Sequence, residues 1–424
     1  MKIKSKFKQR EIGMIPEDWE VKVLKEIASY INEKISLDEI NPNNFISTEN
    51  MLPNKSGITI ASSLPKVGKV TQFKKGDILF SNIRTYFKKF WLAKFSGGCS
   101  NDVLVIRKRL SIDNKYLYYF LSQDNFFEFT VLTSKGTKMP RGDKNSIMSY
   151  EINIPSFPEQ IAIAKILFDL DAKIELNEQM NKTLETLGQA LFKYWFIDFE
   201  FPNEKGKPYK SSGGEMVESE LGDIPEGWEV SKLGDVLSLL KDGSHNPPKR
   251  TTSGIRFIAG ASDLSHFEID FENCSYISEQ DFKEMHRVWE LKENDVLLTI
   301  VGTIGNIAIV KKSDLPFSLQ RSIAVMRANE QISYSYLYFL LNSTNFKMFL
   351  GSRVNPTAQP GIYLGTLSKM ELIIPKKNIL AQYDILAKSI ISFMQKKCAE
   401  TRNLIQLRDS LLPRLMSGKI RVPV

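Results

Sequence analysis

Cationic and amide side chains gather on two segments in the first half of the chain. One segment follows a short apolar run that ends at Ser81 and is rich in aromatic residues, and the other is a glycine-bearing loop ahead of residue 151. Lys and Arg neutralise phosphates, whereas Arg, Asn and Gln present paired hydrogen-bonding groups to base edges. The side chains that this chemistry predicts to contact a nucleic acid are Asn82, Arg84, Lys88, Lys89, Lys135, Lys138, Arg141 and Lys144.

A second set of such side chains lies in the second half of the chain. Its members, on an early loop and on later segments, are His245, Lys249, Arg250, Thr303, Gln320, Arg321, Arg353, Asn355 and Gln359. The groups at 135–144 and 353–359 both precede a closing apolar run, so they are the stronger candidates for approaching DNA. For any single residue, the alternative is a solvated surface charge.

No segment of the sequence carries a complete catalytic motif. Asn246-Pro247-Pro248 has the core of an adenine methyltransferase motif, but Lys249 stands where an aromatic ring would stack on the flipped base. The sequence contains no glycine-rich loop for a dinucleotide or ATP and no GxSxG nucleophile motif. Gly302-Thr303-Ile304-Gly305 fits a phosphate clamp or, equally well, a turn between two strands. The three histidines lack metal-ligand spacing, so we predict a non-catalytic reader without a metal or cofactor of its own.

Composition narrows the class of protein further. A chain of 424 residues with 42% hydrophobic and 25% charged residues suffices for two or more globular domains. Its net charge of +8 favours a polyanionic partner, and a basic protein without such a partner is the alternative. The three cysteines form no paired motif, and no apolar run approaches the roughly 18 residues that would cross a membrane. The basic N-terminus lacks the apolar core of a signal peptide, and we expect a soluble, cytoplasmic protein.

The sequence repeats itself once, with an offset that settles at 220 residues. The opening Ile15-Pro16-Glu17-Asp18-Trp19 returns as Ile224-Pro225-Glu226-Gly227-Trp228. Further pairs are Gly76-Asp77-Ile78-Leu79-Phe80-Ser81 with Asn294-Asp295-Val296-Leu297-Leu298-Thr299, Tyr116-Leu117-Tyr118 with Tyr336-Leu337-Tyr338, and Glu151-Ile152-Asn153-Ile154-Pro155 with Glu371-Leu372-Ile373-Ile374-Pro375. A period this long indicates a duplicated domain with its connector, whereas a solenoid repeats every 20–50 residues.

Each copy is predicted to be an irregular α/β globule that ends in a long helix. Short apolar runs at 77–81, 103–106, 295–300 and 323–325 predict strands, and amphipathic segments at 114–123 and 334–342 predict short helices. The long helical segments run from after residue 160 to about 196 and from about 379 to 415, or about 55 Å each. Pro413 is expected to kink or end the last turn of the second.

The two long helices carry matching apolar stripes with alternating steps of four and three residues. The stripe positions are Ile163, Leu167, Leu170, Ile174, Leu184, Leu191 and Trp195 in the first helix, and Tyr383, Ala387, Ile390, Met394, Leu404, Leu411 and Leu415 in the second. Both stripes turn polar in the middle, at Asn177 and Asn181 and at Lys397 and Thr401, and such polar residues fix register and partner. We therefore predict that the helices pack together. The alternative is that each packs on its own globule.

Taken together, these features resemble the specificity subunits of type I restriction-modification systems. The residues that carry the resemblance are the paired openings, the two strand-loops that begin at Gly76 and Asp295, Asp242-Gly243-Ser244-His245, and the closings at Ile154-Pro155 and Ile374-Pro375. The segment at 242–245 has Ser where the family has Thr, and Asn294 replaces Gly76, so the turn there can differ. Nearly the whole chain is covered, and the ordered double set is specific although each motif is weak alone.

The resemblance implies an α+β fold with two tandem α/β target recognition domains, separated by two long antiparallel helices that form a coiled coil in a pseudo-twofold internal repeat. The boundaries on this reading are 1–156 and 221–377 for the domains, 157–198 for the first helix, 199–220 for a polar linker, and 378–424 for the second helix and tail. Each domain would read one half of a bipartite DNA site.

The resemblance also implies partners. The helices would dock two modification (methyltransferase) subunits, and restriction (translocase-nuclease) subunits would join them. S-adenosylmethionine, ATP and magnesium would belong to those partners. Two alternatives from other classes are a nucleic-acid-binding adaptor outside restriction and a structural protein whose helix pair mediates assembly.

Overall fold

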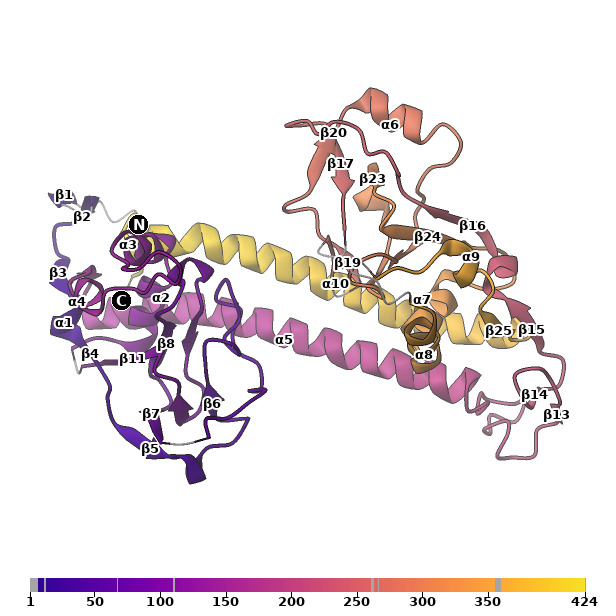
Figure 1. Ribbon diagram of the computed structural model, residues 1–424, viewed down its shortest axis with the longest axis horizontal. Coiled ribbons are helices and arrows are strands. Elements are labelled where there is room, and N and C mark those ends of the chain that lie inside the picture. Colours follow the sequence, from indigo (N-terminus) through magenta and orange to yellow (C-terminus); the bar gives the residue numbers. More distant parts are fainter. Residues whose placement is uncertain are drawn as a thin grey trace. The chain divides into compact units, whose positions relative to one another are not determined.

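The chain folds into two compact units that share both long helices. The computed structural model describes residues 7–10, 13–66, 68–109, 111–260, 263–265, 267–354 and 360–423. One unit comprises Met1–Glu175 with Thr401–Val424, and the other comprises Leu176–Glu400. The helices α5 (Phe157–Phe196) and α10 (Lys377–Met416) therefore each contribute one half to either unit. Figure 1 labels the elements of both units.

The first unit contains two four-stranded sheets and two strand pairs. One sheet has the order β4-β11-β8-β9, and the other β5-β7-β10-β6. The strands are β1 (Phe7–Arg10), β2 (Gly13–Pro16), β3 (Glu20–Val23), β4 (Ala28–Tyr30), β5 (Lys34–Ser36), β6 (Phe45–Ile46), β7 (Lys69–Phe73), β8 (Ile78–Ser81), β9 (Phe90–Leu92), β10 (Gly97–Cys99), β11 (Val103–Lys108) and β12 (Glu151–Ile154). β1 pairs with β2, and β12 with β3, both antiparallel.

Strand β8 is the centre of the first unit because both of its faces are covered. All four of its residues are buried, as the apolar run predicted. Ile78 and Phe80 belong to a core shared with α2, α5 and α10, whereas Leu79 lies in a second core on the opposite face. Asp77, just before the strand, accepts two hydrogen bonds from Arg107, at 2.8 and 2.7 Å. This buried ion pair is the reason for an aspartate at that position of the motif.

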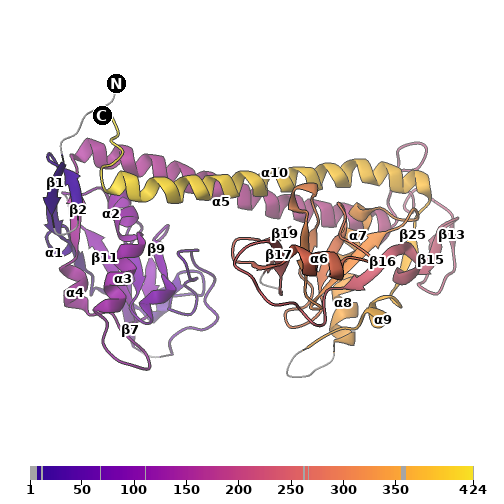
Figure 2. The ribbon, with the colours of Figure 1, turned by 90° about the horizontal axis from the view of Figure 1, so that it is seen from above.

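Short helices cover one face of the sheet that contains β8. They are α1 (Leu24–Ile27), α2 (Asn114–Leu121), α3 (Asp124–Leu132) and α4 (Lys144–Met148). The unit also has single 3₁₀ turns at η1 (Leu37–Glu39), which packs on the core of the other sheet, and η2 (Thr85–Phe87). Figure 2 shows α2 between the strands and the long helices of this unit. Tyr116 of α2 is fully buried, and its hydroxyl donates to the backbone oxygen of Asn153, at 2.7 Å. The helix thereby ties the closing strand to the core.

The second unit repeats the main sheet of the first, whereas its other sheet has three strands, in the order β20-β17-β23. Its main sheet has the order β16-β24-β21-β22, which corresponds strand for strand to β4-β11-β8-β9. The strands are β13 (Met216–Val217), β14 (Ile224–Pro225), β15 (Glu229–Lys232), β16 (Leu237–Asp242), β17 (Ile255–Ile258), β18 (Leu264–Ser265), β19 (Glu268–Ile269), β20 (Ser275–Ile277), β21 (Val296–Thr299), β22 (Ile307–Ile309), β23 (Phe317–Leu319), β24 (Ile323–Ala328) and β25 (Glu371–Ile374). The helical segments are η3 (Leu233–Val236), α6 (Glu279–Met285), η5 (Lys312–Asp314), α7 (Tyr334–Asn342), α8 (Thr344–Arg353) and α9 (Leu364–Leu367).

Equivalent contacts recur in the second unit. Arg327 donates to both carboxylate oxygens of Asp295, at 2.7 and 2.8 Å, as Arg107 does to Asp77. Asn294 has a φ of 70°, which is the left-handed conformation that Gly76 adopts in the first unit. The expectation that this turn can differ is therefore not met, since asparagine tolerates the left-handed region better than most residues.

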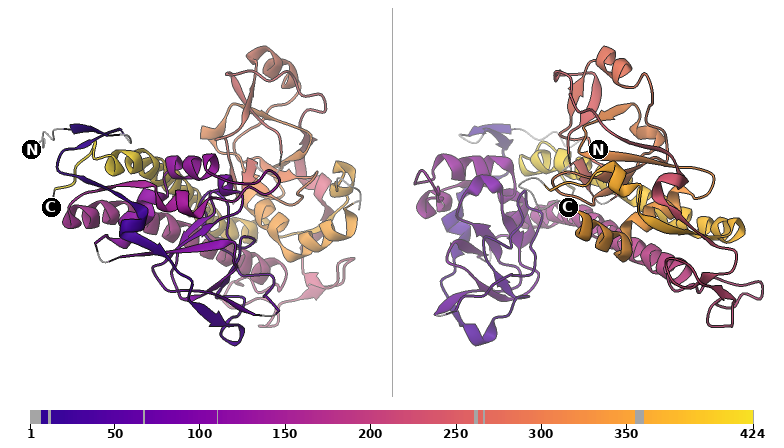
Figure 3. Two further views of the ribbon diagram at one scale, coloured as in Figure 1. Left: turned by 60° about the vertical axis from the view of Figure 1, so that its left-hand side comes forward. Right: turned by 45° about the vertical axis from the view of Figure 1, so that its right-hand side comes forward.

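Within each unit, half of α5 packs beside half of α10. Ile163 of α5 and Leu415 of α10 lie in the core of the first unit, and Trp195 and Tyr383 lie in that of the second, with ring centroids 5.8 Å apart. Figure 3 shows the end of α5 beside the start of α10 in the second unit. The stripe positions that are fully buried are Ile163, Leu167, Ile174, Trp195, Tyr383, Ala387, Ile390, Met394 and Leu415, and the half-buried ones are Leu170, Leu184, Leu191, Leu404 and Leu411. Pro413 lies inside α10 and does not end it.

The segment after α5 is packed, although its composition predicts a polar linker. Phe201 is buried and stacks on Trp228, with ring centroids 4.9 Å apart. In the first unit the segment after α10 behaves similarly, because Arg421 lies over the ring of Trp19. In each unit, the tryptophan of the repeated opening thus packs against the segment that follows a long helix. None of the described helices is long and apolar enough to cross a membrane.

Candidate DNA interface

The two cationic segments of the first unit lie side by side. The chain leaves β8 at Ser81, and Ile83 forms an isolated β-bridge with Arg141. The backbone N–H of Arg84 donates to the oxygen of Pro140, at 2.8 Å. The N–H of Gly142 donates to the oxygen of Asn82, at 3.1 Å. Residues that are about 60 positions apart in the sequence thus form one surface, as a DNA-reading site requires.

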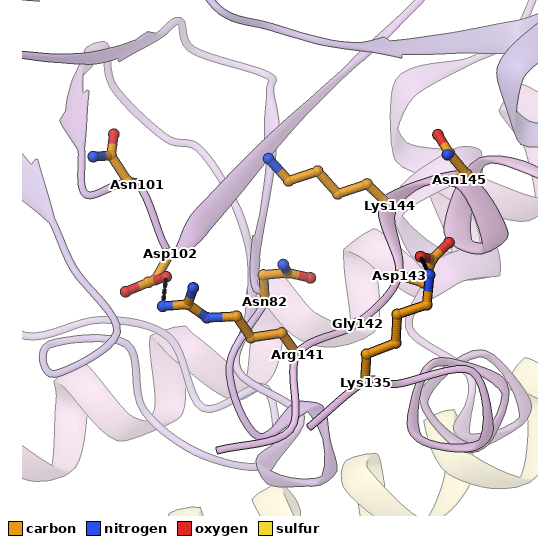
Figure 4. A pocket seen from close by; sticks show the side chains of 9 residues that line it. All are labelled: Asn82, Asn101, Asp102, Lys135, Arg141, Gly142, Asp143, Lys144 and Asn145. Atoms are coloured by element: carbon orange, nitrogen blue, oxygen red, sulfur yellow. Dashed lines mark hydrogen bonds and ion pairs between the residues drawn. The ribbon is translucent and has the colours of Figure 1, made fainter. Parts of the chain in front are cut away.

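A polar pocket of about 360 Å³ opens between these two segments. Its lining residues are Asn82, Asn101, Asp102, Lys135, Arg141, Gly142, Asp143, Lys144 and Asn145 (Figure 4). Arg141 forms an ion pair with Asp102, at 2.9 Å, and Lys135 pairs with Asp143, at 2.5 Å. The hydrogen bond from Lys135, followed by those from Ser146, holds the pKa of Asp143 well below its ordinary value of 3.8. The carboxylate of Asp143 is therefore charged at neutral pH.

Asn82 forms part of the floor of this pocket. Only 7% of its surface is exposed, and its Oδ1 accepts no hydrogen bond from any residue that the structure describes. A Cβ atom at position 142 would lie 2.9 Å from that oxygen, so glycine is needed there to leave room for the amide. An amide with free hydrogen-bonding capacity suits a ligand that brings its own polar groups, as a base edge does.

The predicted cations of the first unit fall into two groups. Lys88 pairs with Asp124, at 2.7 Å, and the Nζ of Lys89 donates to the oxygen of Thr48, so both are engaged within the unit together with Lys135 and Arg141. The exposed side chains of Arg84, Lys138 and Lys144 bind no described residue. This second group is available for phosphates without the loss of an internal ion pair.

The second unit also brings its predicted residues together. Ser244 forms an isolated parallel β-bridge with Gln320, and the N–H of Arg321 donates to the oxygen of Ser244, at 3.1 Å. A Cβ atom on Gly243 would lie 2.1 Å from the oxygen of Leu319. Glycine is therefore required in the Asp242-Gly243-Ser244-His245 segment, because the two backbones touch there.

The strand-loop of the second unit pairs as its counterpart does. Val301 bridges Gly361, and the N–H of Gly302 donates to the oxygen of Pro360, at 2.9 Å, so the turn at 302–305 joins β21 to β22 and faces the loop before α9. Thr303 is exposed at this turn.

The remaining predicted residues of the second unit have separate environments. His245 contacts Asp242, at 2.9 Å, and Arg250 stacks on Phe257. The exposed side chains of Lys249, Arg321 and Arg353 bind no residue in the described part of the chain. Asn355 and Gln359 lie outside the described residues.

Sequence reasoning missed the acidic partners of the first pocket. Asp143 caps α4 through Ser146, whose N–H donates to its carboxylate at 2.9 Å, and an Asp just before a short helix is the signal that could have revealed it. Asn101 and Asp102 lie in a tight turn before β11, and no local pattern connects that turn with residue 141. Among the described residues, no group of three or more His, Cys, Asp or Glu is placed to hold a metal ion.

The geometry defines a class of protein that carries two copies of one mixed α/β fold, each with paired cation- and amide-bearing loops. The profile of the family described as "Type I restriction modification DNA specificity domain" matches residues 16–186 and again 225–406. The chain belongs to this family, as the resemblance of its motifs indicated.

Relatives and a solved structure agree with this assignment. The chain is 26% identical to the type I restriction enzyme MjaIX specificity subunit of Methanocaldococcus jannaschii, over 99% of this chain and 97% of that protein. It is 24% identical to the HindI specificity subunit of Haemophilus influenzae, over 95% of this chain and 100% of that protein. The fold is similar to that of the type I restriction-modification S subunit from M. genitalium, with a TM-score of 0.58 and 15% identity over 97% of this chain and 98% of that one.

Proposed function

We propose that this chain is the DNA-specificity subunit of a type I restriction-modification enzyme, in which each unit binds one half of a bipartite site. The observation that carries the proposal is the repeated pairing of two loops. Ile83 with Arg141 and Val301 with Gly361 are equivalent backbone bridges, and each brings a loop after a buried strand to a loop before the closing strand. The exposed cations beside these bridges supply phosphate contacts, and the differing amides supply different base readout.

We infer that α5 and α10 form a single antiparallel pair with pseudo-twofold symmetry. Contacts within each unit share one register, because the residue numbers in each pair add up to 579: Asp171 with Arg408 at 2.9 Å, Asn181 with Cys398 at 3.0 Å, and Phe196 with Tyr383 at 4.7 Å between ring centroids. With a sequence offset of 220, this register maps onto itself when the two helices are exchanged. Such a pair would keep the two half-sites at one fixed spacing.

The partners in this proposal are two modification subunits, docked on the long helices, and restriction subunits that join them. Apolar side chains that stay exposed on α5 and α10 support a docked partner, among them Ile161, Leu187, Ile385 and Phe393. In this arrangement the chain itself is non-catalytic. S-adenosylmethionine, ATP and magnesium act on the partners, and we expect the assembly to work in the cytoplasm.

Methylation mapping tests the proposed function. The chain is produced together with the modification subunits of its own system, and methylated adenines are mapped in the host DNA. The expected result is one sequence with two defined halves and a constant gap. Methylation without such a bipartite site, or a chain that retains no duplex DNA and no methyltransferase, would favour the adaptor or structural alternatives.

A further inference from the structure

We propose that Tyr86 and Phe87 form an aromatic wedge that enters the base stack of the DNA half-site bound by the first unit. The inference rests on the proposed function and adds a mode of contact to it. The two rings are 49% and 40% exposed, with centroids 4.7 Å apart. Large aromatic side chains are normally buried, and two adjacent exposed rings on one turn call for a partner with flat apolar faces.

The turn that carries the rings is held in a strained conformation. Arg84 and Lys88 flank it with φ values of 49° and 51°, in the left-handed region that residues other than glycine rarely adopt. A second loop packs against it, in which Asn54 and Lys55 have φ values of 54° and 62°. These four are among only seven such non-glycine residues in the described part of the chain. Strain of this kind clusters at functional sites.

Internal contacts make the turn rigid. The N–H groups of Asn54 and Lys55 donate to the oxygens of Phe87 and Lys88, both at 2.9 Å. Between the two flanking residues, Thr85 is only 3% exposed and points into the unit. Asp124 anchors both loops, because it pairs with Lys88 at 2.7 Å and with Lys55 at 3.8 Å. A preorganised turn loses little conformational entropy when its rings enter a partner.

Position and charge identify the partner as DNA. Arg84, at the start of the turn, donates its N–H to Pro140 of the loop that forms the polar pocket, so the rings continue the candidate DNA interface. The Arg84 guanidinium is exposed and binds no described residue. The cation of Arg84 can therefore contact a DNA phosphate while the two adjacent rings contact the stacked bases beside it. Apolar side chains inserted between base steps partially unstack them, and any base offers an aromatic face.

The second unit carries no such rings at the equivalent turn. Gly302-Thr303-Ile304-Gly305 occupies that place, with positive φ values on its two glycines. The wedge is therefore expected at one half-site only. This asymmetry separates it from base unstacking by modification subunits, which would act on both halves.

The test uses the complete complex with its modification subunits and duplexes that carry 2-aminopurine at successive positions of both half-sites. Wild-type complex is expected to raise 2-aminopurine emission at one step within a single half-site. The variant Y86A/F87A is expected to lose that signal and to bind the site about 10-fold or more weakly. The matched control Y86F/F87Y keeps both rings and is expected to retain the signal.

Three outcomes would overturn the wedge while the proposed function stands: a cognate site that is bound with no emission change, a signal equal in wild type and Y86A/F87A, or equal Tyr86- and Phe87-dependent signals in both half-sites. If wild-type complex shows no preference for any bipartite duplex, the proposed function itself fails. Thermal unfolding of Y86A/F87A checks its fold, and the single variant F87A, with the smaller change, repeats the measurement if the double variant unfolds.

Discussion

The division of cations into free and engaged groups predicts how DNA binding responds to salt. We consider the triple variant R84Q/K138Q/K144Q, which removes the three exposed cations of the first unit that bind no described residue. Each cation that neutralises a phosphate contributes about 0.9 to the slope of log K against log salt concentration. If all three contact phosphates, the slope becomes shallower by about 2.7. At about 0.15 M salt each lost contact costs about 0.7 log units, or about 100-fold for the three.

A matched control is available at the other end of the same sheet. Lys75 precedes β8, Lys94 follows β9 and Arg109 follows β11, and antiparallel pairing places these three exposed cations opposite the end that carries Asn82. Lys94 also pairs with Glu175, at 2.5 Å, but such an exposed ion pair contributes little to stability. The variant K75Q/K94Q/R109Q has the same net charge as the test variant. We expect its slope to equal that of wild type and its affinity to stay within about threefold of wild type, because only the distant field changes.

Fluorescence anisotropy of the assembled complex, from about 0.05 to 0.3 M salt, gives both slopes. Because phosphate contacts carry no sequence information, the test variant is expected to bind cognate and random duplexes more weakly by the same factor. Equal slopes for the two triple variants would refute the placement of the interface. A loss confined to the cognate duplex would show that these side chains read bases.

Three further predictions concern stability and the second unit. D77A leaves the half-buried Arg107 with only its longer contact to Glu33, at 3.4 Å, and is expected to destabilise the first unit by about 2 kcal/mol, measured by urea unfolding of the full chain; an unchanged midpoint would contradict this. G243A places a methyl group against a backbone oxygen, so methylation mapping should show relaxed specificity in one half-site only, and relaxation in both would count against the assignment. The hydrogen bond from Arg421 lowers the pKa of Asp18 in the folded protein below its ordinary value of 3.8. The ionised Asp18 therefore stabilises the fold fully above about pH 4, and this stabilisation is lost as the pH falls through the pKa of Asp18 in the folded protein. R421A should remove this acid dependence, and an identical pH profile of unfolding would exclude it.

Local pattern was sufficient to predict the duplicated architecture. The apolar runs at 77–81 and 295–300 became β8 and β21, and the segment at 334–342 became α7 with the same bounds. These predictions succeeded because burial on both faces of a strand, or along one stripe of a helix, fixes the spacing of apolar residues within a single short segment. Stripes of apolar residues at alternating four- and three-residue steps likewise predicted the long helices.

What each polar side chain does was decided by residues far away in the sequence. Lys89 and Lys138 look alike in the sequence, yet the first donates to the oxygen of Thr48 and the second is exposed and binds no residue that the structure describes. Phe201 lies in a stretch with the composition of a linker, but the ring of Trp228 gives it a place to be buried. The type of a residue shows only which kinds of group it can contact, and the fold decides which of them lie within reach.

Periodicity and repetition are local properties, so the amino-acid sequence was enough to predict a doubled α/β fold with long helical connectors and two cationic loop sets. The folded structure was needed to show which cations bind no described residue, why Gly142 and Gly243 are required, and that Asn82 meets the loop around Arg141. Most of those outcomes depend on distances between segments that are tens of residues apart in the sequence. Such distances follow from the packing of the whole core and are recorded in no single stretch of the chain.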